Sequence, residues 1–355
     1  MKPLILTPTL DERLLTRLYY GEDALSILKQ LPNKSVHAIC TSPPYFQIRD
    51  YSTAGQSGLE ATPQEYCQRL VQVCGELFRV LRDDGSLWLN LGDSFAKKTY
   101  PDGIKKGELI GIPWMVVFAL RSIGWYLRSD VIWSKTNPMT EGNPLRVTRS
   151  HEYIFMFTKQ ATGYYYDSFP LLEPVDNPGK VRPFRDAKEH SGSTMRQDNG
   201  RLYIPLSSRN KRSVWTIPTG KFAGAHFAVY PEELVSLIIQ AATSPCCCSQ
   251  CGEPKRRIAD VRESGEGDNR IRHRYTKGWE FRCDCHQNGI SRCLVLDPFS
   301  GSGTTGKVAV SLGHSYSGID INAEYLPMAV QRITGEAMVD ESTDDEISLD
   351  DLFGV

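Results

Sequence analysis

A glycine-rich loop near the end of the chain has the spacing of a nucleotide or nucleoside site. Gly301, Gly303 and Gly306 directly follow the apolar run at 294–297. Glycine suits this place because a ligand can approach the backbone where a strand turns into a helix, with no Cβ in the way. Asp320 ends the next apolar run, where its carboxylate could accept hydrogen bonds from ribose hydroxyls.

Three ligands compete for this loop. A P-loop requires Ser or Thr after its Lys, and Val308 follows Lys307 here, which argues against a nucleoside triphosphate. A dinucleotide oxidoreductase needs further strand–helix units downstream, where the chain is short, and nicotinamide binding would reveal one. A nucleoside ligand without a pyrophosphate remains, such as S-adenosylmethionine. Asp297 and the hydroxyls of Thr304 and Thr305 suit its amino-acid end.

The pentapeptide TSPPY at 41–45 follows the β-rich run VHAIC, at the carboxyl end of an expected strand. Open α/β sheets bind their ligands at this end. Two prolines fix the backbone and remove two N–H donors, so hydroxyl and carbonyl oxygens are left to accept from an amine. Tyr45 adds an aromatic face. The segment fits the exocyclic amine of a planar base, and a Pro-rich turn with a packing Tyr is the simpler alternative.

Seven of the ten cysteines lie between 246 and 293. In a reducing compartment, clustered cysteines indicate a metal rather than disulfides. Cys248, Cys251, Cys283 and Cys285 form two pairs that could hold a structural Zn²⁺ tetrahedrally. Cys246, Cys247, Cys293 and His286 are further candidates, and unliganded thiols remain an alternative. Cys40, Cys67 and Cys74 lie in apolar patterns and are expected to be buried.

Strands and helices alternate around these motifs. Helical periodicity covers 65–82, 112–122 and 231–242, and β-rich runs cover 86–92, 125–133 and 152–159. Between about 168 and 212 the period is lost in Pro, Gly, Ser and Arg-rich text. The segment 180–212 holds nine cations against three acids, which favours a polyanion contact over a solvated linker.

The whole chain of 355 residues has a formal net charge of -1. This average is misleading, because eight acids and no Lys or Arg lie in 336–355, and residues 1–335 therefore carry +7. The tail is expected to be disordered. We find no secretory signal and no apolar run of about 20 residues, so we expect a cytoplasmic protein without a membrane segment.

TSPPY at 41–45, together with DPFSGSGTTG at 297–306, resembles the S-adenosylmethionine-dependent amino-methyltransferases of DNA. The catalytic loop comes first and the cofactor loop last, an order that resembles the permuted β class. The resemblance extends over most of 18–240 and 294–333. It implies a Rossmann-like α/β sheet, permuted and mostly parallel, with an irregular target-recognition region and a small Cys-rich insert. The implied partner is double-stranded DNA, with a cognate restriction endonuclease as a possible second partner.

The resemblance also implies roles for individual residues. The implied catalytic residues are Ser42, Pro43, Pro44 and Tyr45. Ser42 and the Pro43 carbonyl would hold the target amine, and Tyr45 would stack on a base flipped out of the duplex. Ser42 stands where adenine-specific relatives usually carry Asp or Asn, which favours cytosine N4 over adenine N6. The implied cofactor-binding residues are Asp23, Thr41, His226, Phe227, Asp297, Phe299, Gly301, Gly303, Thr304, Thr305 and Asp320. The expected DNA contacts are Arg182, Arg185, Arg196, Arg201, Arg209 and Lys211.

The expected organisation has five parts. A catalytic part (1–167) precedes the target-recognition region (168–212), and the cofactor-binding part (213–244 and 294–335) encloses a zinc-ribbon-like insert (245–293). The acidic tail (336–355) follows. A non-catalytic DNA-binding module with a vestigial cofactor loop is the alternative from another class, and the intact TSPPY and glycine loop argue against it. The sequence leaves the oligomeric state open.

Overall fold

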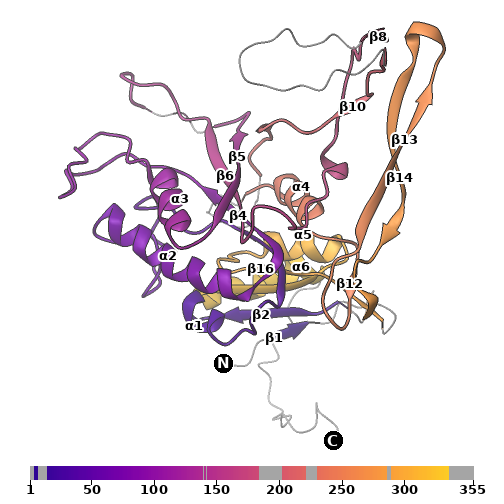
Figure 1. The fold of residues 1–355 in the computed structure, drawn as a ribbon. Helices are drawn as coiled ribbons and strands as arrows, with labels where there is room; N and C mark the ends of the chain where they lie inside the picture. Colours follow the sequence, from indigo (N-terminus) through magenta and orange to yellow (C-terminus); the bar gives the residue numbers. More distant parts are fainter. Residues whose placement is uncertain are drawn as a thin grey trace, which may run out of the picture.

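A large central sheet organises the computed structural model, which describes residues 4–6, 14–138, 140, 142–183, 202–220, 230–285 and 289–335 (Figure 1). Nine strands form this sheet in the order β1-β2-β17-β16-β3-β4-β6-β5-β11. They are β1 (Leu4–Leu6), β2 (Thr16–Tyr20), β3 (Val36–Thr41), β4 (Leu81–Leu91), β5 (Tyr126–Ser134), β6 (His151–Thr158), β11 (Val214–Thr216), β16 (Leu294–Asp297) and β17 (Ser315–Asp320). The sheet is mostly parallel as expected, since only β1 and β6 run against their neighbours.

Helices cover both faces of the sheet. The α-helices are α1 (Ala24–Leu28), α2 (Pro63–Val80), α3 (Ile112–Ser122), α4 (Glu232–Ala242), α5 (Thr304–Ser311) and α6 (Leu326–Thr334). Residues of α1, α2 and α3 share one buried cluster, and residues of α4, α5 and α6 share a second. The sheet therefore lies between two apolar cores, as in other doubly wound α/β domains.

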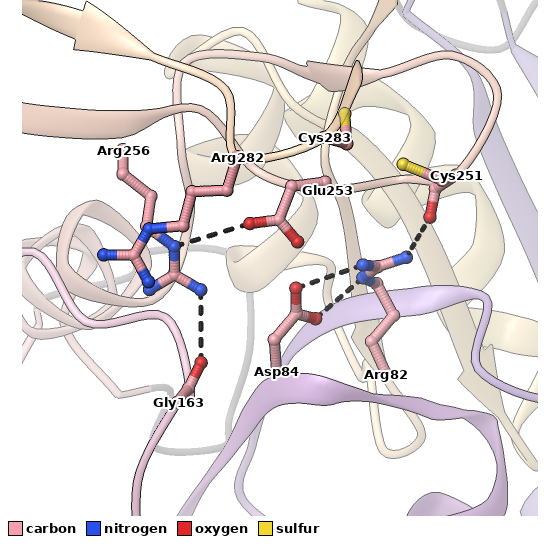
Figure 2. Close-up of a pocket in the computed structure, with 8 residues that line it drawn as sticks. All are labelled: Arg82, Asp84, Gly163, Cys251, Glu253, Arg256, Arg282 and Cys283. Atoms are coloured by element: carbon pink, nitrogen blue, oxygen red, sulfur yellow. Dashed lines mark hydrogen bonds and ion pairs between the residues drawn. The ribbon is translucent and has the colours of Figure 1, made fainter. Parts of the chain in front are cut away.

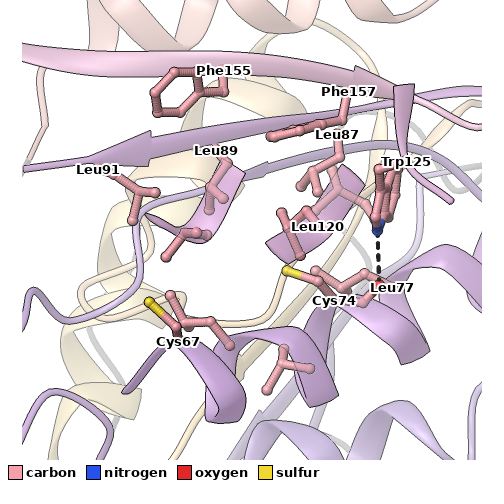
Figure 3. Close-up of a cluster of buried hydrophobic side chains, with 14 of the residues drawn as sticks. Cys67, Cys74, Leu77, Leu87, Leu89, Leu91, Leu120, Trp125, Phe155 and Phe157 are labelled. Carbon is pink, nitrogen blue, oxygen red and sulfur yellow. Dashed lines mark hydrogen bonds between the residues drawn. The ribbon is translucent and has the colours of Figure 1, made fainter. Parts of the chain in front are cut away.

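The longest helix, α2, shows how local sequence builds the first core. Thr62 caps it by accepting from the Glu65 N–H, and Pro63 occupies the first turn. Its buried face includes Cys67, Cys74 and Leu77, which pack toward the sheet beside Trp125 (Figure 3). The indole Nε1 of Trp125 donates to the Cys74 carbonyl at 3.3 Å. Cys40, Cys67 and Cys74 are all buried, which confirms the expectation for these thiols.

One boundary differs from the sequence prediction. The helix expected over 65–82 ends at Val80, and residues 83–85, whose sequence DDG is typical of a turn, lie inside β4. The β3–β4 ladder pairs Val36 with Leu81 and then resumes at Ala38 with Ser86, so the intervening residues of β4 bulge out of register. Arg82 and Asp84 pair with each other there, with Nε to Oδ1 at 2.8 Å. This side-chain pair sits where glycine and acids had indicated a turn.

The remaining elements are short, apart from one long hairpin. The region after β6 contains η1 (Phe169–Leu171), β7 (Glu173–Pro174), β8 (Arg182–Pro183), β9 (Leu202–Tyr203) and β10 (Ser208–Arg209). The Cys-rich insert contains β12 (Cys247–Cys248), β13 (Arg256–Ser264), η2 (Gly267–Asn269), β14 (Ile271–Glu280) and β15 (Ile290–Ser291). A last short element, η4 (Ala323–Tyr325), precedes α6. Figure 1 shows the β13–β14 hairpin rising beside β8 and β10.

The hairpin joins the irregular region through backbone hydrogen bonds. The Ser207 N–H donates to the Arg272 carbonyl at 2.9 Å, and the Arg272 N–H donates to the Pro205 carbonyl at 2.8 Å. The Cys-rich insert therefore supports the described part of 168–212 directly, a contact that the sequence did not predict. Among the helices that the structure describes, none has the length and apolar character needed to span a membrane.

Candidate active site

A pocket opens at the carboxyl ends of β2, β3, β16 and β17. Its walls come from the start of α1, the TSPPY loop, the loop 51–57, α2, the glycine loop and the segment after β17. It is lined by Asp23, Ala24, Ser42, Pro44, Tyr51, Gly55, Gln56, Ser57, Arg69, Pro298, Phe299, Gly301, Asp320, Ile321, Asn322 and Tyr325. Ser42 on one wall thus shares a cavity with Gly301 and Asp320 on another, although more than 250 residues separate them in the chain.

Asp297 holds the floor of this region together. Its Oδ1 accepts from Thr41 Oγ1 at 2.6 Å and from the Phe299 N–H at 3.0 Å. Its Oδ2 accepts from Thr305 Oγ1 at 2.6 Å and from Tyr230 Oη at 3.2 Å. Burial raises the pKa of Asp297 and these hydrogen bonds oppose the rise. Asp297 is 1% exposed and joins the TSPPY strand to the glycine loop beneath the pocket lining.

The three glycines of the loop have different surroundings. Gly301 lines the pocket, and its N–H donates to Asp320 Oδ2 at 2.7 Å. Gly303 has a φ of +78°, and a Cβ there would come within 3.1 Å of Ala329 on α6. A Cβ at Gly306 would meet Ile333 and Tyr316 at 2.6 Å. The close approach at Gly303 and Gly306 is therefore to neighbouring protein atoms, with Gly301 facing the cavity.

Two hydroxyl-bearing residues near the loop have contrasting environments. Tyr20 Oη donates to the Gly301 carbonyl at 2.8 Å and fixes the loop from β2. The Thr304 hydroxyl is buried and has no hydrogen-bond partner among the described residues. A buried hydroxyl without a partner is costly, so a polar ligand group that reached it would gain a hydrogen bond. Thr304 is 2% exposed and is not among the residues that line the pocket, so its contact with the cofactor stays a prediction.

Asp23 and Arg69 shape the opposite wall. Asp23 caps α1, its Oδ2 accepting from the Leu25 N–H at 3.1 Å and the Ser26 N–H at 3.3 Å. Arg69 on α2 donates to Ser57 Oγ at 2.8 Å and to the Gly55 carbonyl. It thereby holds the loop 51–57 against the pocket. Arg69 and Tyr51 were not among the predicted site residues, because neither lies in a motif and only the fold brings them to the cavity.

The TSPPY loop is held from α2 and from β6. Tyr66 Oη donates to the Pro44 carbonyl at 2.9 Å. Tyr45 Oη donates to Glu152 Oε2 at 2.6 Å, and Ser42 Oγ lies 3.4 Å from Tyr45 Oη. The Tyr45 ring packs so closely on Gly92 that a Cβ there would lie 2.5 Å from Cε2. Glu152 lies in no motif and was not among the predicted site residues.

Comparison with known proteins gives the family. Residues 36–331 match the N6/N4 family model described as DNA methylase. The chain belongs to this family. It is 36% identical over 334 residues to the Type II methyltransferase M.Cfr9I of Citrobacter freundii, covering 88% of this chain and 86% of that protein. M.SmaI of Serratia marcescens, also a Type II methyltransferase, is 32% identical over 331 residues. The match covers 88% of this chain and 88% of that protein.

Solved structures show the same fold. The cytosine-N4-specific PvuII DNA methyltransferase matches with a TM-score of 0.55 at 16% identity, over 93% of this chain and 88% of that one. A putative DNA modification methylase of Thermus thermophilus, complexed with S-adenosyl-L-methionine, matches with a TM-score of 0.50 at 20% identity, over 91% of this chain and 96% of that one. The protein is thus a DNA methyltransferase of the N4/N6 amino-methyltransferase family. The expected family and fold are confirmed.

The Cys-rich insert of this methyltransferase brings four thiols together. The Sγ atoms of Cys248, Cys251, Cys283 and Cys285 all lie within 4.8 Å of one another. Those of Cys248 and Cys285 are 3.6 Å apart. Four sulfurs at about 2.3 Å from a tetrahedral Zn²⁺ would be separated by roughly 3.8 Å. The sulfur positions therefore fit such an ion.

A second cluster near the insert is satisfied by protein groups. His37, Cys247 and Cys293 also have ligand atoms within 4.8 Å of one another. His37 Nδ1 accepts from the Leu294 N–H at 3.0 Å, so Nε2 carries the proton and donates to the Gly252 carbonyl at 3.1 Å. Cys293 Sγ donates to the Ser244 carbonyl at 3.3 Å. Because both His37 nitrogens are occupied, this cluster serves as a hydrogen-bonded joint.

The joint continues through a polar cleft between the insert and β4 (Figure 2). Arg82 pairs with both carboxylate oxygens of Asp84 and donates to the Cys251 carbonyl at 2.8 Å. Gly252 has a φ of +73°, and a Cβ there would lie 2.3 Å from the Arg82 guanidinium. The positive φ favours glycine at this turn, where the four-thiol cluster meets the body of the protein.

The expected DNA contacts are only partly within the described residues. Arg185, Arg196 and Arg201 lie outside them, as do His226 and Phe227 of the cofactor set. Of Arg182 the backbone alone is described, as part of β8. Arg209 and Lys211 are described, and with Arg212 they surround Glu173 at 3.2, 3.9 and 2.9 Å. Three cations share one carboxylate, which leaves a local excess of positive charge.

Proposed function

We propose that this enzyme methylates the exocyclic N4 amine of cytosine in duplex DNA. The position of Ser42 carries this proposal. Its side chain lies on the wall of the cavity that also contains Gly301 and Asp320, so an amine held by Ser42 lies beside the pocket for the methyl donor. A serine at the first position of the four-residue motif favours cytosine, and adenine N6 is the alternative on the same scaffold.

We infer that the methyl donor is S-adenosylmethionine. Phe299 offers an apolar surface for its adenosine part, and Asp320 offers carboxylate oxygens at the far wall. Thr304, whose hydroxyl is buried without a partner among the described residues, would lie at the amino-acid end. The fold is shared with a structure that was determined in complex with this molecule. His226 and Phe227 would complete the site.

The chemistry needs alignment and an acceptor for hydrogen bonds. The amine nitrogen attacks the sulfonium methyl in line, and Ser42 Oγ and the Pro43 carbonyl accept its N–H groups and draw its lone pair out of conjugation. Tyr45 would stack on the target base. The base must leave the duplex to reach this depth, because its amine is inaccessible within the stack.

Further assignments follow from the same proposal. The region 168–212 would read the target sequence, with Arg182, Arg185, Arg196, Arg201, Arg209 and Lys211 on DNA phosphates or bases. The four-thiol cluster would hold one structural Zn²⁺ within the insert 245–293. Residues 1–167 would form the catalytic part, and 213–244 with 294–335 the cofactor-binding part. A cognate restriction endonuclease would cleave the unmodified site.

Product identification tests the base specificity. Plasmid DNA is incubated with the enzyme and S-adenosylmethionine, digested to nucleosides and analysed by mass spectrometry. We expect N4-methylcytosine, and N6-methyladenine would overturn the choice of base. Thermal-shift titration with S-adenosylmethionine and with nicotinamide dinucleotides tests the donor independently. Stabilisation by a dinucleotide alone would overturn the proposal as a whole.

A further inference from the structure

A buried charged network lies directly behind the TSPPY loop. Glu152 Oε2 accepts from Tyr45 Oη at 2.6 Å and from Asn90 Nδ2 at 3.1 Å. Its other oxygen, Oε1, accepts from Lys135 Nζ. The side chains of Glu152 and Lys135 are only 14% and 19% exposed. Removing a carboxylate from water costs free energy even when three donors bind it, and packing of the core does not require a charge at this place.

The reversed direction of β6 brings Glu152 to this place. Most strands of the sheet present their carboxyl ends to the pocket, whereas β6 presents its amino end. Leu91 at the end of β4 pairs with Tyr153, and Glu152 is the next residue toward the pocket. On its other side Glu152 pairs with Trp133 of β5, two residues before Lys135. The three strands therefore deliver Asn90, Lys135 and Glu152 to one point.

Methyl transfer to an amine releases a proton. The N–C bond forms as the S–C bond breaks and its electron pair stays on sulfur, so the methylated nitrogen becomes positive and must lose a proton. Ser42 is hydrogen-bonded to the amine in the proposed function, and its Oγ lies 3.4 Å from Tyr45 Oη. This link is longer than the roughly 2.8 Å typical of two hydroxyls, and catalytic hydrogen bonds commonly tighten when the substrate binds.

We propose that Glu152 receives this proton through Ser42 and Tyr45. The amine proton passes to Ser42 Oγ, the Ser42 hydroxyl proton passes to Tyr45 Oη, and the Tyr45 proton passes to Glu152 Oε2. Glu152 ends as a neutral carboxylic acid and both hydroxyls are restored. Glu152 is a positioning residue in this scheme, because it acts on the target only through Tyr45. Lys135 and Asn90 orient its carboxylate.

The inference rests on the proposed place of the target amine beside Ser42. It also explains a feature of Tyr45 that stacking alone does not require. A stacking ring needs no hydroxyl, yet Tyr45 Oη is fixed by Glu152 and also lies 3.1 Å from Asn90 Oδ1. Phenylalanine would preserve the ring and remove the relay, so the two roles of Tyr45 can be separated.

The test is a double-mutant cycle on the full-length enzyme with Tyr45→Phe, Glu152→Gln and the double variant. We expect each single variant to lower kcat for DNA methylation by about 100-fold, with KM for DNA and for S-adenosylmethionine changed less than threefold. The double variant should be no slower than either single variant, because both break one relay. Glu152→Asp should recover part of the rate. Glu76→Gln, which loses a pair with Arg79 at 2.8 Å on α2, is the matched control.

Several results would overturn the relay. One is a wild-type rate for Tyr45→Phe, and another is a double variant whose loss equals the product of the two single losses. If Glu152→Gln fails to fold, judged by thermal unfolding and S-adenosylmethionine binding, the Tyr45→Phe rate still decides. Ser42→Ala separates the two proposals. If it stays active, the proposed site of the amine is wrong, and if it is inactive while Tyr45→Phe and Glu152→Gln are active, only the relay is wrong.

Discussion

The two ends of β3 have opposite tasks. At the carboxyl end, Thr41 leads into the TSPPY loop, and Ser42 and Pro44 of this loop line a pocket. At the amino end, the ring of His37 joins the Cys-rich insert to the start of β16 through two backbone contacts. One strand thus connects the pocket at one edge of the sheet with a structural joint at the other edge. Variants at the pocket end should therefore lose methylation, and variants at the joint should lose zinc and DNA binding.

The difference lies in how each end uses its polar groups. At the pocket, Ser42 Oγ has a long contact, 3.4 Å from Tyr45 Oη, so polar capacity remains there for a ligand. At the joint, both nitrogens of His37 and the thiol of Cys293 are already paired. The remaining hydrogen-bonding capacity of Ser42, compared with the paired groups of the joint, distinguishes these two ends of β3.

Ser42→Ala should give the largest effect on methylation. Removing the hydroxyl takes away a hydrogen bond to the amine that strengthens as charge develops, and we expect kcat to fall by at least about 100-fold. S-adenosylmethionine binding should persist, because the rest of the pocket is intact. Methylation kinetics and isothermal titration calorimetry measure the two quantities. Ser122→Ala, on the last turn of α3, is the control, and a full rate for Ser42→Ala would contradict the assigned role.

Cys251→Ser should damage the other end of the strand. With one of four thiols lost, we expect zinc content to fall from one ion per chain toward none and DNA affinity to drop by about tenfold. The reason is that β14 pairs with 205–207, so a loosened insert withdraws support from the recognition region. Binding of S-adenosylmethionine should change little.

Elemental analysis and fluorescence anisotropy with a duplex oligonucleotide measure these effects. Cys246→Ser is the matched control, since Cys246 lies in the same insert and outside the four-thiol cluster. Two zinc ions per wild-type chain would show that the cluster of His37, Cys247 and Cys293 also binds metal, against the hydrogen-bonded joint inferred for it. Unchanged DNA affinity in Cys251→Ser would remove the link between insert and recognition.

The sequence predicted the pocket end of β3 better than the joint at its other end. TSPPY and the glycine loop are contiguous motifs, and their positions after β3 and β16 follow from the strand pattern. The four cysteines were also predictable from spacing, and the structure brings their sulfurs together. Arg69, Glu152 and His37 were not, because each acts through a partner that lies far away in the chain. Glu152 in particular depends on the reversed direction of β6, which alternating apolar residues do not encode.

A smaller effect is expected from pH at the pocket. Burial raises the pKa of Asp320 to about 6, although the N–H groups of Asn322 and Gly301 oppose the rise. Because the pKa is raised, the neutral form of Asp320 stabilises the fold at low pH, and this stabilisation is lost as the pH rises through about 6. The ionised form accepts hydrogen bonds from ribose hydroxyls more strongly than the neutral acid does. Affinity for S-adenosylmethionine should therefore fall by up to tenfold per pH unit below about 6.

Calorimetric titrations between pH 5 and pH 8 measure this dependence. Asp320→Asn should bind more weakly at every pH and lose the dependence in this range, because an amide does not titrate there. A wild-type affinity that stays constant down to pH 5 would show that Asp320 makes no ionised contact with the ligand. Ser42→Ala offers a useful comparison, since it should keep the wild-type pH dependence while losing activity.

Deleting the tail should give the smallest effect and tests whether DNA affinity comes from shaped surfaces or from charge alone. The tail, 336–355, lies outside the described residues and carries eight acids without a Lys or Arg. Its removal raises the net charge of the chain from -1 to +7. We expect non-specific DNA binding to tighten several-fold at about 50 mM salt and to change little at about 200 mM, because salt screens distant charges.

Anisotropy titrations at both salt concentrations measure this change in DNA affinity, with kcat as a control. Equal tightening at both concentrations would instead indicate that the tail covers a specific DNA-contacting surface.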